Sequence, residues 1–147
     1  MEKKMKVLFL STGNSTRGQM AEGFARQLAG DRLVAVNAGI ESSDSNPLVT
    51  EVMEEVGVDI SGQRPKNVAQ SLKEHFGYVV TLYDAARERS PVFPFTTNLI
   101  QWSVKDPAPT DAPAEEKKEQ LRRVRDDIRG KVEGLVHKIA QRDRTAA

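Results

Sequence analysis

Residues 7–24 read VLFLSTGNSTRGQMAEGF, a short apolar run followed by a polar turn and the start of an amphipathic pattern. The run at 7–10 is typical of a strand buried on both faces, as in a parallel sheet. From 17 to 29 apolar side chains recur at helical spacing until a glycine ends the pattern. These positions are Met20, Ala21, Phe24, Ala25 and Leu28, with Gly30 at the end. A strand, a loop and a helix therefore open the fold.

The rest of the chain continues this alternation of short apolar runs and amphipathic segments. Alternating strands and helices predict an α/β fold with a parallel sheet and helices on both of its faces. Ligands in such sheets bind at the carboxyl ends of strands, so the loop after the first strand is the leading candidate site. The further expected strands are 33–38, 77–82 and 98–103, and the further helices are 47–56, ended by Gly57, and 114 to about 141.

Length and charge limit the kind of protein this chain is. A chain of 147 residues fits one domain, 1–147, with a single core. Its 22 basic and 21 acidic residues leave a net charge of +1, which offers no global field for nucleic acid or an anionic membrane. The apolar run at 7–10 is too short for a secretory signal or a membrane span, so we expect a cytoplasmic protein.

The chain contains no cysteine. This excludes disulfides, cysteine-ligated zinc, iron–sulfur clusters and any mechanism in which a thiol of this chain is the nucleophile or redox carrier. The two histidines, His75 and His137, lie far apart in the sequence and have no ligand neighbours at metal-binding spacing. We therefore expect no metal site and no cofactor.

The loop at 11–17 suits an anion. Successive backbone N–H groups, the positive end of the following helix and the Arg17 guanidinium can converge on bound oxygens. The alternative is an ordinary Gly-Asn turn with a solvent-exposed arginine. The candidate oxyanion-binding residues are Ser11, Thr12, Gly13, Asn14, Ser15, Thr16 and Arg17.

Two resemblances compete at this loop. Its hydroxyl-rich stretch looks like the loop by which flavodoxins hold the FMN phosphate. Ser11 and Arg17, separated by five residues, look like the phosphatase loop with its cysteine replaced. The remaining motifs favour the second: RGQMAEGF at 17–24, AGIES at 38–42, EVGVDIS at 55–61, VVTL at 79–82 and DPA at 106–108. In this order they resemble the low-molecular-weight tyrosine phosphatase and thioredoxin-coupled arsenate reductase family, over most of residues 6–140.

This resemblance implies a three-layer α/β/α fold with a four-stranded parallel sheet, and a mechanism. In the family a loop cysteine attacks phosphorus or arsenic, the loop arginine holds the equatorial oxygens, and an aspartate before a proline protonates the leaving oxygen. These places fall on Ser11, Arg17 and Asp106, although Asp-Pro also begins ordinary turns. Thr16, Tyr83 and Ser90 stand where the reductases carry further cysteines.

The missing thiol changes what this loop can do. A thiol with an ordinary pKa of ~8.5 is readily ionised by a helix N-terminus and a guanidinium. A serine hydroxyl ionises several units higher and needs a positioned base, and no histidine lies near the loop in the sequence. Arsenate reduction needs electrons delivered through thiols, so at most an external thiol could reduce a bound arsenate.

Three functional hypotheses follow. The first is a noncatalytic member, a pseudoenzyme that binds or senses phosphate or arsenate, or an inactivated reductase or phosphatase from an arsenic-resistance background. The second is weak hydrolysis through Ser11 or water with Asp106 as the acid. The third is a flavodoxin-like FMN carrier. Any protein partner is unknown from the sequence.

Two further features concern the origin and the support of the loop. Serine at 11 fits either an engineered replacement or a natural one, and Tyr83 and Gly18, which also depart from the family, favour a natural thiol-free relative. Some arsenate reductases hold a cation beneath the loop with an asparagine, a glutamate and an aspartate. Asn14 and Glu22 match, whereas Lys66 falls at the aspartate position, where its ammonium either replaces the cation or lies in a solvated turn.

Aromatic and basic residues outside the loop are expected to have structural rather than functional roles. Tyr78 and Trp102 are expected to pack in the sheet and core rather than stack on a substrate. The last helix carries three arginines among acidic residues, and a solvated face is expected for them. These are Arg122, Arg123 and Arg125.

Overall fold

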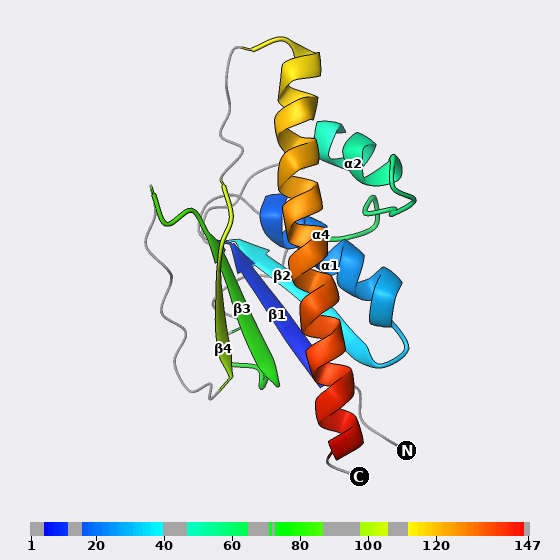
Figure 1. The fold of residues 1–147 in the computed structure, drawn as a ribbon, viewed down its shortest axis with the longest axis vertical. Coiled ribbons are helices and arrows are strands. Elements are labelled where there is room, and N and C mark those ends of the chain that lie inside the picture. Colours follow the sequence, from blue (N-terminus) through cyan, green and yellow to red (C-terminus); the bar gives the residue numbers. More distant parts are fainter. Residues whose placement is uncertain are drawn as a thin grey trace.

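The computed structural model describes residues 5–11, 16–39, 47–64, 71, 73–86, 98–105 and 112–145, with side chains through 142. Strands and helices alternate along the described residues (Figure 1). The strands are β1 (Met5–Ser11), β2 (Leu33–Gly39), β3 (Tyr78–Tyr83) and β4 (Leu99–Ser103), and the helices are α1 (Thr16–Ala29), α2 (Pro47–Glu54) and α4 (Ala114–Thr145).

The four strands form one parallel sheet in the order β2-β1-β3-β4. This confirms the predicted α/β class and four-stranded parallel sheet, and every expected element begins or ends within a few residues of its prediction. The chain leaves β1 toward β2 on one side and later enters β3 on the other. The sheet therefore has its topological switch point at the carboxyl end of β1, where ligands of such folds bind.

Side chains of β1 alternate between two apolar cores. Val7 and Phe9 belong to the larger core, which α1 and α4 share. Leu8 and Leu10 belong to a smaller core on the opposite face, with Phe76. All four β1 side chains are essentially inaccessible to solvent, so both faces of the sheet are covered, as a three-layer arrangement requires.

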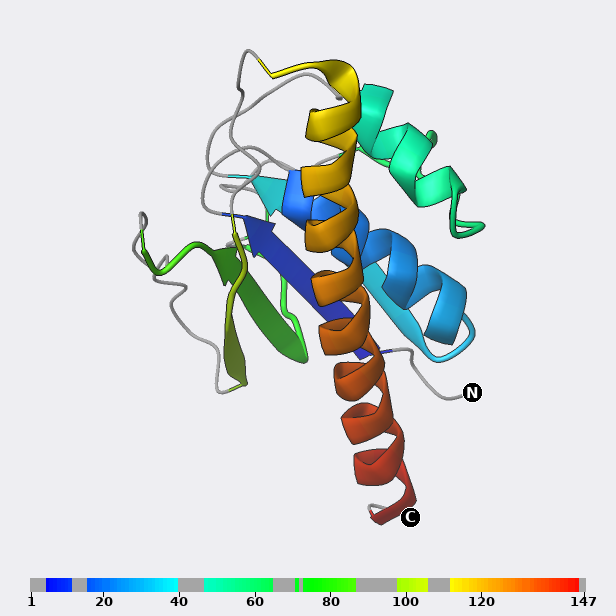
Figure 2. The same ribbon diagram turned by 45° about the horizontal axis from the view of Figure 1, so that its top comes forward.

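The long helix α4 lies across the same face of the sheet as α1, and α2 lies beside its N-terminal half (Figures 1 and 2). The predicted apolar stripe of α4 is buried. Among the described residues, no helix is both long enough and apolar enough to span a bilayer. The buried stripe consists of Leu121, Val124, Ile128, Val132, Leu135 and Ile139.

One predicted core residue of α1 is wrong. Leu28 is 38% exposed, whereas Met20 and Phe24 are buried. Four residues turn a helix by about 400°, so a spacing of four drifts by about 40° at each step. By Leu28 the drift has carried the side chain off the buried face, and Ala25 and Ala29 occupy that face instead.

The end of α2 follows its sequence signal. Gly57 has a φ of 78°, the left-handed conformation that glycine adopts without strain. Its N–H donates to the carbonyl of Glu54, and the N–H of Val58 donates to the carbonyl of Met53 at 3.0 Å. This pair of bonds is a Schellman motif, and it confirms Gly57 as the helix stop.

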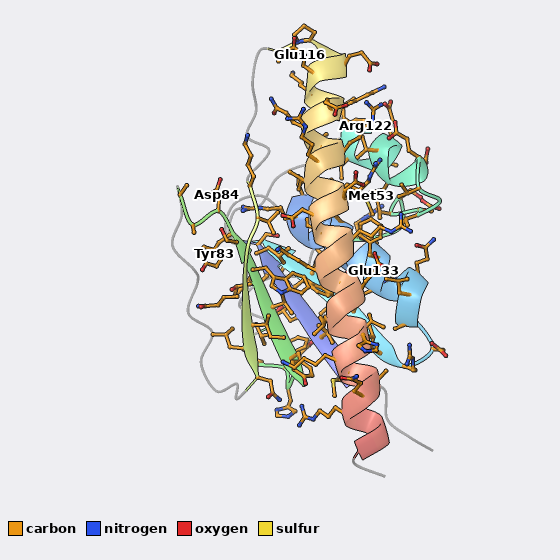
Figure 3. The ribbon with its side chains drawn as sticks, viewed as in Figure 1. Met53, Tyr83, Asp84, Glu116, Arg122 and Glu133 are labelled. Atoms are coloured by element: carbon orange, nitrogen blue, oxygen red, sulfur yellow. The ribbon has the colours of Figure 1, made fainter. Side chains whose placement is uncertain are left out.

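Two of the three arginines on α4 are paired rather than merely solvated. Arg122 contacts both oxygens of Glu55, just beyond α2, with Nη2 2.8 Å from Oε2, and Figure 3 shows it facing α2. The side chain of Arg125 is only 10% exposed, and its Nη1 donates to Glu55 and to the Val52 carbonyl. For Arg125 the predicted solvated face is wrong, because α2 covers this side of the helix, whereas Arg122 is partly covered with 29% of its side chain exposed. The prediction is correct for Arg123, which is 78% exposed.

The same interface changes the acidity of its groups. The hydrogen bond from Arg122, helped by Arg125, lowers the pKa of Glu55 to about 2. Beside it, Lys118 Nζ lies 2.9 Å from Glu51, whose carboxylate raises the pKa of the lysine. We call this set the α2–α4 ion network: Glu51, Glu55, Lys118, Arg122 and Arg125.

Candidate functional site

Ser11 is the last residue of β1 and lies at the switch point of the sheet. It is flanked in register by Gly39 of β2 and Leu82 of β3 and is 0% exposed. The Gly18 N–H donates to its hydroxyl oxygen at 2.8 Å. The hydroxyl is therefore fixed against the first turn of α1.

Gly18 packs closely against the end of β1. A Cβ at this position would lie 2.9 Å from Ser11 Oγ, 3.2 Å from Asn37 Cβ and 3.3 Å from the carbonyl oxygen of Phe9. Contacts this short force neighbouring atoms to move. The glycine, noted in the sequence as a departure from the family, thus lets α1 pack directly against the end of β1.

Arg17 lies on the first turn of α1 and is completely buried. Its Nη1 donates to the carbonyl oxygen of Val104 at 3.2 Å. Val104 is held in turn by its own N–H, which donates to the carbonyl of Tyr83 at 2.7 Å. The alternative of a solvent-exposed arginine after an ordinary turn is therefore wrong, because the guanidinium bridges the loop region to the chain that follows β4.

Glu22 is the acidic group of the region, one turn further along α1. Its Oε1 accepts the Asn37 side-chain amide at 2.9 Å, and its Oε2 lies 3.0 Å from Arg26 Nε. The Glu22 side chain is 3% exposed, whereas that of Arg26 is 57% exposed. Oε1 therefore accepts a hydrogen bond, whereas Oε2 faces Arg26 as an ion pair.

The resemblance implied a cation site at this place. Of its three positions Glu22 alone lies within the described residues, and its two oxygens face the Asn37 amide and the Arg26 guanidinium. Within the described residues no group of three or more His, Cys, Asp or Glu side chains is placed to hold a metal ion. The other two positions, Asn14 and Lys66, lie outside the described residues, so the replacement of the cation by an ammonium stays a prediction.

The structure places some of the predicted site residues and leaves others outside the described ranges. It brings together Ser11, Arg17 and the end of β4. Thr16 begins α1, and Tyr83 ends β3 with Asp84 beside it, at the carboxyl edge of the sheet (Figure 3). The residues outside the described ranges are Thr12, Gly13, Asn14, Ser15, Lys66, Ser90 and Asp106.

Sequence reasoning missed two residues of this region. Asn37 is a polar residue in the apolar run of β2 and is 0% exposed; that single break in the pattern was the available signal. Val104 takes part through its backbone carbonyl, which no side-chain pattern reveals. Tyr78 and Trp102 behave as predicted: Tyr78 lies in the core, and the Trp102 ring lies 6.2 Å from that of Phe9.

A comparison with protein families gives one assignment for almost the whole chain. The sequence pattern of the family described as low molecular weight phosphotyrosine protein phosphatase matches residues 6–145. The chain belongs to this family. Family membership accounts for the loop and for the downstream motifs together, so the flavodoxin alternative is no longer needed.

The relatives within this phosphatase family include arsenate reductases. The chain is 41% identical to the arsenate reductase of Halalkalibacterium halodurans over 128 residues, 87% of this chain and 91% of that protein. The same identity and coverage hold for the arsenate reductase of Bacillus subtilis. The resemblance inferred from the motifs is confirmed.

Solved structures of the family share the fold. One, described as an arsenate reductase in the phosphate binding state, superposes with a TM-score of 0.76 at 32% identity, covering 92% of this chain and 98% of that one. A low molecular weight protein tyrosine phosphatase from T. tengcongensis superposes with a TM-score of 0.68 at 22% identity, covering 92% and 99%, and supports the fold alone.

Proposed function

We propose that this member of the phosphatase family binds a tetrahedral oxyanion, phosphate or arsenate, in the loop at 11–17 and performs no thiol chemistry. The observation that carries the proposal is the buried Arg17 on the first turn of α1, beside Ser11 at the switch point of the sheet. A relative of the same fold is described in a phosphate binding state. The binding role is carried to this chain by analogy with it.

Ser11 is assigned the role of a hydrogen-bond donor. Its oxygen already accepts the Gly18 N–H, so one lone pair is occupied by the protein. The hydroxyl proton remains to be donated to a ligand oxygen. A neutral hydroxyl also avoids the repulsion that a thiolate exerts on a dianion. The serine therefore favours holding an oxyanion over attacking it.

Arg17 is assigned the role of the anion clamp. Its planar guanidinium carries five N–H donors in a fork that matches the oxygens of an oxyanion, and Nη1 also donates to the Val104 carbonyl. The same bond ties the clamp to the segment that leads into Asp106, the place of the general acid. A second candidate function, slow hydrolysis of a phosphate ester by water or Ser11 with Asp106 as acid, rests on this connection.

The test is calorimetric titration of the chain with phosphate and with arsenate. We expect both to bind, and we expect Arg17→Ala to lower the affinity by about 10- to 100-fold, the worth of one charge-assisted hydrogen bond. The matched control is Arg32→Ala, an exposed arginine beyond the far end of α1, which should leave binding unchanged. Circular dichroism establishes that each variant is folded.

A second arm separates binding from chemistry. Wild type and Ser11→Cys are assayed on an aryl phosphate, and Ser11→Cys also on arsenate with thioredoxin. Hydrolysis that appears only in Ser11→Cys supports a site disabled at one atom. Hydrolysis by wild type that Asp106→Asn abolishes supports the second candidate. A folded wild type that binds neither anion rules out both.

A further inference from the structure

A cavity of about 240 Å³ lies between the end of β4 and the N-terminal half of α4. These two segments lie at the same end of the molecule in both views (Figures 1 and 2). The family roles assigned above leave this cavity unused. The described residues that line it are Lys105, Gln120, Arg123, Val124 and Asp127.

The cavity offers an anion two positive charges and a carboxamide. Arg123 is 78% exposed and pairs with Glu119 at 3.7 Å, a loose surface pair that a ligand can displace. The carboxylate in the lining, Asp127, is paired with Lys131 at 3.3 Å, which offsets its charge. Lys105 supplies the second cation, and its side chain is exposed.

The cavity also lies close to the proposed oxyanion clamp. Arg17 Nη1 is 3.2 Å from the Val104 carbonyl oxygen, and Lys105 is the next residue. Standard backbone dimensions therefore put the Lys105 Cα within about 6 Å of that guanidinium nitrogen. The backbone that lines one side of the cavity thus begins next to the residue that holds the proposed clamp.

Size and lining indicate what part of a small molecule would fit. Pockets that enclose a whole drug-sized ligand measure roughly 300–1,000 Å³, so this cavity suits only part of one. Val124, which is 4% exposed, gives it an apolar surface, and the cations give it a polar end. The matching group is a carboxylate or second phosphate carried on a short apolar spacer.

We propose that this cavity is a second anion subsite. It accepts the carboxylate or second phosphate of a small phosphate ester whose first phosphoryl group lies in the loop at 11–17. This inference rests on the proposed function and extends it, because it names the ligand class as organic phosphates with two anionic groups rather than free phosphate or arsenate.

The test compares three ligands of one shape by calorimetric titration: phenyl phosphate, 4-carboxyphenyl phosphate and its neutral isostere, 4-carboxamidophenyl phosphate. We expect the carboxylate to bind wild type about five- to tenfold more tightly than the amide, as one charge-assisted contact near the surface provides. The advantage should shrink as salt is raised, because the cations are exposed.

Variants then locate the contact. Arg123→Gln and Lys105→Gln should each reduce the preference for the carboxylate to less than twofold, while the affinity for inorganic phosphate stays unchanged. Arg129→Gln is the matched control, since this arginine lies further along α4 and does not line the cavity. It should keep the full preference.

The outcomes separate the two proposals. If inorganic phosphate binds but the carboxylate gains nothing over the amide, the subsite is wrong and the oxyanion loop stands. A carboxylate preference that survives in both glutamine variants places the second anion elsewhere and also overturns the subsite. If wild type binds no phosphate at all, the proposed function fails and the subsite fails with it.

Discussion

Two clusters of arginine and glutamate side chains stabilise this protein, and they differ in burial. Under the candidate loop, the Glu22 side chain is 3% exposed and is held by Asn37, which is fully buried, and by Arg26. In the α2–α4 ion network, the Glu55 side chain is 38% exposed and is held by two arginines. We call the first set the loop-support cluster: Ser11, Gly18, Glu22, Arg26 and Asn37.

The comparison teaches that burial decides what a charged contact contributes to stability. Glu55 is paired with two arginines, but water competes for each exposed contact and salt screens it. Glu22 is buried, so its removal takes the acceptor from a buried amide, and the interior supplies no water in exchange. We therefore expect the loop-support cluster to dominate stability.

The largest effect is expected for Glu22→Ala. The change removes the acceptor of the buried Asn37 amide, and we expect the free energy of unfolding to fall by about 2–3 kcal/mol. Urea denaturation followed by circular dichroism measures it. Glu22→Gln, which keeps an oxygen for Asn37, should lose less.

The control for this prediction is Glu133→Ala. Glu133 is 56% exposed and pairs with Arg129 along α4 at 3.6 Å, so its loss should change the free energy of unfolding by no more than about 0.5 kcal/mol. Equal losses in Glu22→Ala and Glu133→Ala would break the comparison.

The next effect concerns the backbone of the loop-support cluster. Gly18→Ala gains about 1 kcal/mol of helix propensity but forces its Cβ to 2.9 Å from Ser11 Oγ. Overpacking of this kind costs about 1–3 kcal/mol, and the contacts with Asn37 and the Phe9 backbone cannot relax easily, so we expect a net loss of about 1 kcal/mol. Chemical denaturation of Gly18→Ala, Ser11→Ala and the double variant measures it. The double variant should be less destabilised than the sum of the two, and strict additivity would argue against the contact.

Gly130→Ala on α4 should stabilise the protein, in contrast to Gly18→Ala. A Cβ at Gly130 meets no atom within 4 Å, and the residue is exposed in the interior of the helix. The alanine gains helix propensity without a clash, so we expect the free energy of unfolding to rise by about 0.5–1 kcal/mol. Thermal and urea melts check it. A destabilised Gly130→Ala would mean that α4 is packed on this side.

The sequence predicted the parts of this structure that depend on local patterns. The strand at 7–10, the helix that follows it and the stop at Gly57 rest on periodicity and backbone conformation, and all three are confirmed. The error at Leu28 has a local cause too, since a spacing of four residues drifts around the helix.

Contacts between side chains of elements that are distant in the sequence could not be predicted from it. Arg17 meets a carbonyl 87 residues away, and Arg125 meets a glutamate 70 residues away. A single sequence gives the face of a helix but not the side chain that covers it from another element. For this reason the loop was found from its residue types, while Asn37 and Val104 were not.

The smallest effect is expected from acid acting on the α2–α4 ion network. Arg122 and Arg125 hold the pKa of Glu55 at about 2, below its ordinary value of 4.5. A carboxyl group with a lowered pKa in the folded state stabilises fully above its unfolded pKa and loses that contribution as pH falls through the folded value. The stability difference between wild type and Glu55→Gln should therefore be constant above pH 4.5 and shrink between about 4.5 and 2.

Urea midpoints across this pH range measure the difference. Because Arg122 is the main cause of the lowered pKa of Glu55, Arg122→Gln should flatten the pH dependence. A gap that stays constant down to pH 2 would show that the arginines leave the acidity of Glu55 unchanged, and the contrast with the buried Glu22 would then rest on burial alone.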